Sequence, residues 1–340
     1  MALHEVDLSA KKHIIVLGAG IIGLSTALRL SQKKQNLRIT VISDGEPLSV
    51  NAGAVWLPHI HPVDDDDCKF IATAALNTYE WLSQQLAIDS NTHIEAVTLC
   101  DRGTKASTAV PWWMSHLGDI CDATITEDGY TLSSFSIDPK GLINNLYKLC
   151  ETAGVHFITA HISTRGDLMH YDGDVFVNCT SAPIGGEHSG SGGGGSSATQ
   201  KAACWVGLCD GDIAVPAIAD ISGDEHWWVF ARPPNLKTGR REVVCGGPCG
   251  DDSSEKDARK HMADFAPDEL GRLLNEVVCW DRCSTLTRPV CTRGKHSILS
   301  IEWDDKHPRL LHNYGYGGAG FTLGWGMAEH VTCLILKAIE

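Results

Sequence analysis

The sequence predicts an α/β protein with an α+β part, and three observations carry that prediction. Residues 13–42 form a β-α-β pattern: an apolar run (HIIVL), apolar residues three and four apart, and a β-branched run (LRITVI). A second apolar run, 175–179, follows a stretch at 138–150 with helical spacing and an Asp-Pro start. Residues 227–247 predict two strands joined by a polar turn. We therefore expect a parallel sheet with helices beside it and a second sheet that is mixed or antiparallel.

The composition is that of an acidic globular protein. Of the 340 residues, 43% are hydrophobic and 21% are charged, which is ordinary for a globular chain. Acidic residues outnumber basic ones by 42 to 28, so the formal net charge is −14, and no Lys/Arg-rich block could neutralise phosphates. We therefore expect neither nucleic acid nor an anionic membrane as a partner. The oligomeric state stays open between a monomer and a homodimer.

The sequence shows neither a membrane span nor a signal peptide, and its cysteines are scattered. We therefore expect an intracellular protein, cytoplasmic or peroxisomal. No apolar run approaches the roughly 20 residues that span a bilayer, and the opening MALHEVDLSAKK lacks the apolar core of a signal peptide. The thirteen cysteines are odd in number and scattered, without tight pairs at metal-binding spacing. We therefore expect buried, reduced thiols and no metal site.

A glycine motif, residues 18–23 (GAGIIG), directly follows the first predicted strand and opens the first predicted helix. Gly18 permits a tight turn, Gly20 lets the backbone approach a diphosphate, and Gly23 allows the helix to pack closely on the strand. Asp44 ends the next strand, where an acidic residue accepts a hydrogen bond from a ribose hydroxyl. The motif predicts a dinucleotide but leaves FAD and NAD open, because both contain a diphosphate and a ribose. A glycine-rich turn without a cofactor is the alternative.

Three further segments favour FAD by resemblance. Residues 52–58 (AGAVWLP), 287–289 (TRP) and 312–326 (HNYGYGGAGFTLGWG) together resemble the D-amino-acid oxidase family of flavoproteins, which includes the D-aspartate oxidases. Residues 111–113 and 177–180 are weaker landmarks of the same family. The resemblance extends from the first strand to the last helix and implies FAD as the cofactor.

The resemblance also implies two domains, each assembled from separated parts of the chain. A Rossmann-like FAD-binding domain with a parallel sheet is expected from residues 1–61, 138–188 and 285–340. A substrate-binding domain with a mixed or antiparallel sheet is expected from residues 62–137 and 198–284. Residues 189–197 (SGSGGGGSS) have the composition of a flexible linker, and two interpretations stay open: a natural loop, or an engineered replacement of a native one.

The family pattern assigns roles to individual residues. Arg288, a planar and permanently charged donor, would bind the substrate carboxylate, and the Gly318 carbonyl would accept a hydrogen bond from the amine. Thr322 would offer its hydroxyl to the polar edge of the flavin, and residues 325–339 would form a helix whose N-terminus favours negative charge there. The expected catalytic residues are Arg288, Gly318 and Trp228, and the expected substrate-binding residues are these three with His59 and Trp56. The expected cofactor-binding residues are Gly18, Ala19, Gly20, Ile21, Ile22, Gly23, Asp44, Ala52, Gly53, Ala54, Ile162, Gly317, Gly318, Ala319, Gly320, Phe321 and Thr322.

The activity that the resemblance implies is that of an FAD-dependent oxidase acting on the CH–NH2 group of a D-amino acid. The α-hydrogen would pass as hydride to the flavin, and the resulting imino acid would hydrolyse to a keto acid and ammonia. Molecular oxygen would reoxidise the flavin and yield hydrogen peroxide. Two alternatives stay open: a flavoenzyme of secondary metabolism that oxidises a bulkier amine or amino-acid derivative, and a flavin-binding protein without turnover.

Several positions depart from the family pattern. Trp228 stands where the family has a tyrosine that helps to hold the carboxylate, and Asp224 stands near the place of a second tyrosine. His59, His61 and Arg232 could each match an acidic substrate side chain, or each could be an ordinary solvated residue. The sequence therefore defines the cofactor better than the substrate.

Overall fold

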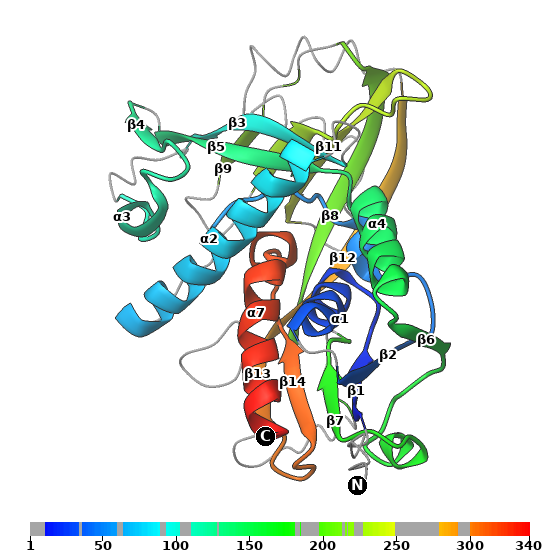
Figure 1. The fold of residues 1–340 in the computed structure, drawn as a ribbon. Helices are drawn as coiled ribbons and strands as arrows, with labels where there is room; N and C mark the ends of the chain where they lie inside the picture. Colours follow the sequence, from blue (N-terminus) through cyan, green and yellow to red (C-terminus); the bar gives the residue numbers. More distant parts are fainter. Residues whose placement is uncertain are drawn as a thin grey trace, which may run out of the picture.

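The described part of the chain forms two β-sheets, one of six strands and one of eight (Figure 1). The structure is a computed structural model. It describes residues 11–33, 36–59, 64–88, 93–102, 110–127, 129–180, 184, 197–212, 215, 217–220, 227–248, 279–291 and 300–340. Of the suspected linker, residues 189–196 lie outside these ranges, and Ser197 is the first residue of a strand.

The six-stranded sheet has the parallel arrangement that the sequence predicts. Its order is β13 (Ser300–Trp303), β14 (Leu310–Tyr314), β7 (Val175–Asn178), β1 (Lys12–Leu17), β2 (Leu37–Ser43) and β6 (His156–Thr159). All neighbours are parallel except the edge strand β13, which is antiparallel to β14. Ile14, Ile15 and Val16 are completely buried, because both faces of a central parallel strand are covered.

The eight-stranded sheet is mixed, also as predicted. Its order is β12 (Cys279–Cys291), β8 (Ser197–Asp210), β11 (Arg240–Pro248), β10 (Trp227–Ala231), β9 (Ala217–Asp220), β3 (Ile94–Arg102), β5 (Gly129–Ile137) and β4 (Thr124–Thr126). Only β3 and β9 pair in parallel, and β10 and β11 form the antiparallel pair predicted at residues 227–247. The fold class is therefore confirmed. The domain boundaries stay a proposal. Strand β12 contains the boundary that the sequence analysis expects between residues 284 and 285.

The helices in the described ranges are α1 (Ile21–Lys33), α2 (Asp65–Ile88), α3 (Met114–Leu117), α4 (Pro139–Thr152) and α7 (Gly320–Ala338), with 3-10 turns η1 (Leu48–Asn51) and η2 (Asp167–His170). Asp138 caps α4 by accepting a hydrogen bond from the Gly141 N–H at 3.1 Å, as its Asp-Pro start predicts. Asp64, the first residue of the acidic run, caps α2 in the same way by accepting from the N–H groups of Asp66 and Asp67.

Helix α7 lies between α1 and α2 and packs against both (Figure 1). It begins at Gly320, five residues before the predicted start at residue 325, because the glycines at its start form a regular helical turn. Trp325 stacks on Trp81 of α2 at 4.5 Å between ring centroids, and the Arg29 guanidinium lies 5.3 Å from the Trp325 ring. These contacts fix the end of α7 that faces the site. No helix in the described ranges is long and apolar enough to cross a membrane.

Candidate cofactor and substrate site

A cavity of about 570 Å³ is lined by residues from both sheets. This volume is within the usual range for small-molecule and cofactor sites. Most of the predicted cofactor residues lie in its lining: Gly18, Ala19, Gly20, Ile21, Ile22, Asp44, Ala52, Gly53, Ala54, Ile162, Gly317, Gly318, Gly320 and Phe321. Two of the predicted substrate residues, His59 and Trp228, lie there as well. Segments from both ends of the chain thus meet at one cavity.

The glycine turn between β1 and α1 forms one end of the cavity. The Gly18 N–H donates to the Ile42 carbonyl oxygen at 2.7 Å, and Gly18 has a φ of 98°, which side chains rarely allow. A Cβ on Gly18 would stand 2.8 Å from the Cys179 carbonyl oxygen. Gly23 does not line the cavity; a Cβ on it would overlap the Gly18 carbonyl oxygen, so Gly23 acts through helix-to-strand packing.

Ser49 is a site residue that the sequence analysis missed. It belongs to η1, and its hydroxyl oxygen accepts a hydrogen bond from the Ile21 N–H at 3.2 Å, at the start of α1. A Cβ on Gly20 would stand 2.8 Å from the same oxygen. The contact joins residues 28 positions apart, so no local pattern in the sequence indicates it.

Asp44 lies where β2 ends, and its carboxylate accepts a hydrogen bond from the His161 ring. This hydrogen bond lowers the pKa of the Asp44 carboxyl below its ordinary value. Both residues line the cavity. The carboxylate is therefore charged and able to accept a hydrogen bond from a sugar hydroxyl, the role that the glycine motif predicts for it.

The segment of residues 52–57 connects the cavity to the larger sheet. The Ile137 N–H donates to the Ala54 carbonyl oxygen at 2.9 Å, and Ala54 has a φ of 64°, an uncommon value for a residue with a side chain. Arg232 is buried: it pairs with Glu242 and donates to the Ala52 carbonyl oxygen at 2.8 Å. Arg232 thus holds the segment of residues 52–57 against β10, and it does not line the cavity.

Trp228 forms the wall of the cavity on β10. It pairs with Gly246 across the sheet, and its indole lies where a Cβ on Gly246 would be. On the other side, the indole nitrogen is 3.1 Å from the position of a Cβ on Gly53. The indole therefore occupies a slot between two glycines, Gly246 and Gly53.

The glycine loop before α7 forms the far end of the cavity. Gly315 and Gly317 have φ values of 89° and 54°. Between them, the buried Tyr316 hydroxyl donates to Asn313 Oδ1 at 2.5 Å, and Asn313 Nδ2 donates to Thr26 Oγ1 at 3.2 Å. Burial raises the pKa of Tyr316 well above its ordinary value, so the hydroxyl keeps its proton. The Tyr316 and Asn313 side chains thus anchor the loop to α1.

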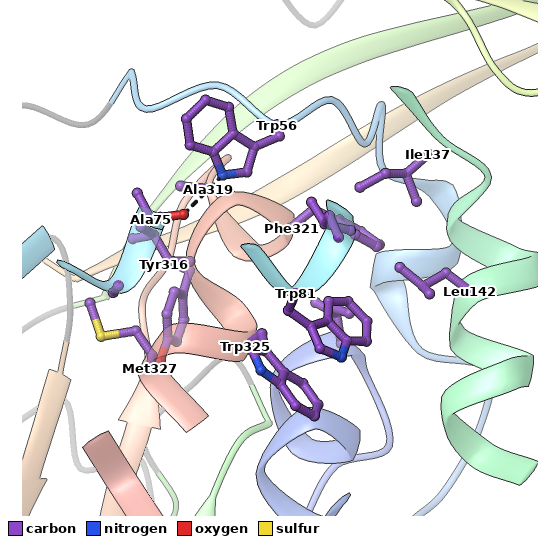
Figure 2. Packing of buried hydrophobic residues seen from close by; sticks show 14 of the residues in the cluster. Trp56, Ala75, Trp81, Ile137, Leu142, Tyr316, Ala319, Phe321, Trp325 and Met327 are labelled. Carbon is purple, nitrogen blue, oxygen red and sulfur yellow. Dashed lines mark hydrogen bonds between the residues drawn. The ribbon is translucent and has the colours of Figure 1, made fainter. Parts of the chain in front are cut away.

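Three predicted site residues lie in the packed core and do not line the cavity: Trp56, Ala319 and Thr322. Figure 2 shows the Trp56 indole directed at the Ala75 carbonyl oxygen, to which it donates at 3.2 Å. The Thr322 hydroxyl donates to the Leu57 carbonyl oxygen at 3.1 Å and accepts from the Leu57 N–H at 3.2 Å. Because the Thr322 hydroxyl donates its hydrogen to Leu57, it has no hydrogen to offer to the edge of a flavin. Thr322 instead joins α7 to the segment of residues 52–57.

Some predicted residues cannot be placed in the site. Arg288 lies on β12, opposite Gln200 of β8, but its side chain is outside the described part of the chain. In the sheet, β8 and β11 separate β12 from β10, and β12 also approaches η1. His61 and Asp224 lie outside the described residues. Among the residues that are described, no three His, Cys, Asp or Glu side chains are placed to hold a metal ion.

The cavity fits FAD in three respects. The glycine turn presents Gly18 and Gly20, which carry no side chains, to the cavity at the start of α1, where a helix N-terminus favours a diphosphate. The charged carboxylate of Asp44 lies where a sugar is expected. At the far end, Gly317 and Gly318 leave backbone alone beside the place of a flat ring.

The comparisons with known proteins agree with this fit. The family DAO, described as FAD dependent oxidoreductase, matches residues 13–334. A D-amino-acid oxidase of Streptomyces coelicolor is 25% identical over 341 residues, covering 97% of this chain and 98% of that protein. D-aspartate oxidase 1 of Caenorhabditis elegans is 22% identical over 371 residues, covering 96% and 98%. The solved glycine oxidase from Geobacillus kaustophilus has a similar fold, with a TM-score of 0.66 at 11% identity and coverage of 96% and 94%.

The family match includes the glycine turn, the segment at residues 52–57 and the loop before α7, which are the parts of the chain that line the cavity. The chain therefore belongs to the DAO family of FAD-dependent oxidoreductases, and FAD is its cofactor.

Proposed function

We propose that this enzyme oxidises the C–N bond of a small amino acid, with a simple D-amino acid as substrate. The observation that carries the proposal is the continuity of one cavity from the glycine turn, past Gly317 and Gly318, to the wall formed by Trp228 and Phe230. A substrate between that wall and the glycine loop would lie beside the flavin. The names of the two relatives, a D-amino-acid oxidase and a D-aspartate oxidase, support the same class of substrate.

FAD, when bound, would supply the two-electron oxidant for the substrate C–N bond, with molecular oxygen as the final electron acceptor. The chain contributes position and a dry environment. The Gly318 carbonyl would accept a hydrogen bond from the substrate amine, and Arg288 would bind the carboxylate. Leu57 and Phe230, both almost completely buried, line the cavity and exclude water, which favours the neutral amine. The products would be an imino acid, which hydrolyses to a keto acid and ammonia, and hydrogen peroxide.

The experiment is a panel of D- and L-amino acids with the FAD-loaded enzyme, read out by peroxide. We expect peroxide from at least one simple D-amino acid and none from its L-enantiomer. Arg288→Leu should raise KM for that substrate roughly 100-fold, because two charge-assisted hydrogen bonds are lost. Arg240→Leu, a change on exposed β11 surface, is the matched control and should leave KM unchanged. An enzyme that oxidises only L-amino acids would contradict the proposal.

The second candidate function is oxidation of a bulkier amine or amino-acid derivative. The observation that favours it is the slot of Trp228, since the indole replaces a phenol that the family uses to hold a carboxylate. Anaerobic bleaching of the flavin by individual amines distinguishes the cases. Bleaching by larger amines but by no simple D-amino acid would favour this candidate. A flavin that no amine reduces would instead indicate a binding protein without turnover.

A further inference from the structure

The side chain of Asn313 lies where three parts of the cavity wall meet. Asn313 is near the end of β14, two residues before the glycine loop of residues 315–319, and it is completely buried. Its side chain contacts this loop through Tyr316, helix α1 through Thr26, and the residue after β7, Cys179. One amide group therefore connects elements from the two ends of the cavity.

On the loop side, the amide oxygen of Asn313 holds Tyr316. The Tyr316 hydroxyl donates to Asn313 Oδ1 at 2.5 Å, and the Tyr316 carbonyl oxygen accepts from the Ala319 N–H at 2.9 Å. The second bond closes a turn whose two central residues, Gly317 and Gly318, line the cavity. Because glycine restricts the backbone less than any other residue, the position of this turn depends strongly on the anchored tyrosine.

On the α1 side, the amide nitrogen of Asn313 holds Thr26. Asn313 Nδ2 donates to Thr26 Oγ1 at 3.2 Å, and the Thr26 hydroxyl donates to the Ile22 carbonyl oxygen at 2.8 Å, one turn nearer to the start of α1. Asn313 Nδ2 also lies 3.6 Å from Cys179 Sγ. Thr26 is completely buried, and Ile22 and Cys179 line the cavity. The amide is thus tied to the helix that begins at the diphosphate end of the cavity.

The glycine turn at that end has anchors of its own. The Gly18 N–H donates to the Ile42 carbonyl oxygen at 2.7 Å, and the Ile21 N–H donates to the Ser49 hydroxyl oxygen at 3.2 Å. Neither hydrogen bond involves Asn313. Loss of the Asn313 contacts would therefore displace the glycine loop relative to the glycine turn and leave the turn itself in place.

We propose that Asn313 is a positioning residue that sets the place of the glycine loop relative to the glycine turn, so that the diphosphate and the flavin ring of one FAD molecule bind together. Tyr316 and Thr26 are the contacts through which it acts. A ligand with two linked parts gains affinity from both sites only where their separation matches its own length. The expected signature is a loss of affinity for FAD without a loss for a ligand that occupies the diphosphate end alone.

ADP is such a ligand, since it contains the adenosine and diphosphate parts of FAD but no flavin. Tyr316→Phe removes one hydroxyl and keeps the ring. It should raise the dissociation constant of FAD roughly tenfold, equivalent to about 1.4 kcal/mol, and leave that of ADP within twofold of the parent protein. Isothermal titration of the apoprotein with each nucleotide measures both constants. Unchanged FAD affinity, or equal losses for FAD and ADP, would overturn the proposal.

Substitutions at Thr26 test the other contact. Thr26→Val removes the acceptor of the Asn313 amide and should weaken FAD binding roughly three- to tenfold without affecting ADP, whereas Thr26→Ser should restore FAD affinity to within twofold of the parent. Thr78→Val on α2 is the matched control. Thr78 is also buried, donates to the Ala74 carbonyl oxygen at 2.9 Å and accepts from the Gly326 N–H at 3.0 Å. The control should keep its FAD affinity within twofold; a selective loss there would overturn the proposal, because any buried hydroxyl would then have the same effect.

A double-mutant cycle shows whether the two contacts act through the same amide. Either change alone frees the Asn313 side chain, so Tyr316→Phe combined with Thr26→Val should lose less FAD affinity than the product of the two single factors. Additive losses in free energy would show that Tyr316 and Thr26 act independently of Asn313 and would overturn the proposal. If Tyr316→Phe does not fold, the two Thr26 variants and the Thr78 control still decide the matter.

Discussion

Replacing Gly23 with alanine isolates the part that helix packing plays in cofactor binding. A Cβ at this position would overlap the Gly18 carbonyl oxygen, and a backbone atom cannot rotate away as a side chain can. Alanine favours the helix by about 1 kcal/mol, whereas overpacking costs about 1–3 kcal/mol, so we expect a net loss of about 0–2 kcal/mol in unfolding free energy. The shift of α1 away from the turn should affect FAD more strongly. Loss of two amide-to-phosphate hydrogen bonds would weaken binding by about 3 kcal/mol, roughly 100-fold.

The assay pairs thermal unfolding of the apoprotein with titration of FAD by flavin fluorescence. Gly324→Ala is the matched control, because Gly324 is also helical and packs against α1. A Cβ there would meet only flexible side-chain ends, 3.2 Å from Ile22 Cδ1 and 3.5 Å from Ile21 Cγ1. We expect its FAD affinity to stay within threefold of the parent. If Gly23→Ala also binds FAD within threefold, close packing of α1 on the turn does not control the diphosphate site.

Three further predictions concern residues around the cavity. Trp56→Phe loses the hydrogen bond to Ala75 and should lower the unfolding free energy by about 1 kcal/mol without changing KM, measured by denaturant melts and steady-state kinetics. Thr322→Val leaves two backbone groups unpaired, and calorimetry should show a loss of about 2 kcal/mol that Thr322→Ser restores. Because the pKa of Asp44 is lowered, the contribution of its carboxylate to FAD binding is present above the ordinary carboxyl pKa of 3.8. That contribution is lost as pH falls through the lowered value. His161→Ala should therefore move acid release of FAD to higher pH, and an unchanged release curve would contradict this role.

The sequence predicts the parts of the fold that are local. The strand, turn and helix around residues 13–42 are confirmed, because hydrophobic period and glycine placement act over a few residues. The start of α4 at Asp138 is confirmed for the same reason. The start of α7 is predicted five residues late, since Gly317 to Gly320 give no sign of where a loop of glycines becomes a helix.

The candidate site is predicted less completely, because its contacts join distant residues. Thr322 and Leu57 are 265 positions apart, and only the folded chain shows that the hydroxyl is used within the core. Trp56 belongs to a segment that lines the cavity, yet its indole donates to the Ala75 carbonyl oxygen within the core (Figure 2). Conversely, Ser49 resembles any serine in a loop until α1 is placed beside it. Motifs identify segments of a site, whereas the direction of each side chain depends on tertiary packing.

The interleaving of the two sheets along the chain has a consequence for biosynthesis. A nascent chain that has reached the middle of the sequence contains β1, α1 and β2, but β14 and α7 are still to be translated. Until residues 310–338 emerge, β7 lacks its neighbour on one side, and the cavity lacks the loop that closes it. FAD capture must therefore follow translation of nearly the whole chain. During that time the edge of β7 exposes unpaired backbone N–H and C=O groups, the kind of strand edge on which other chains can pair.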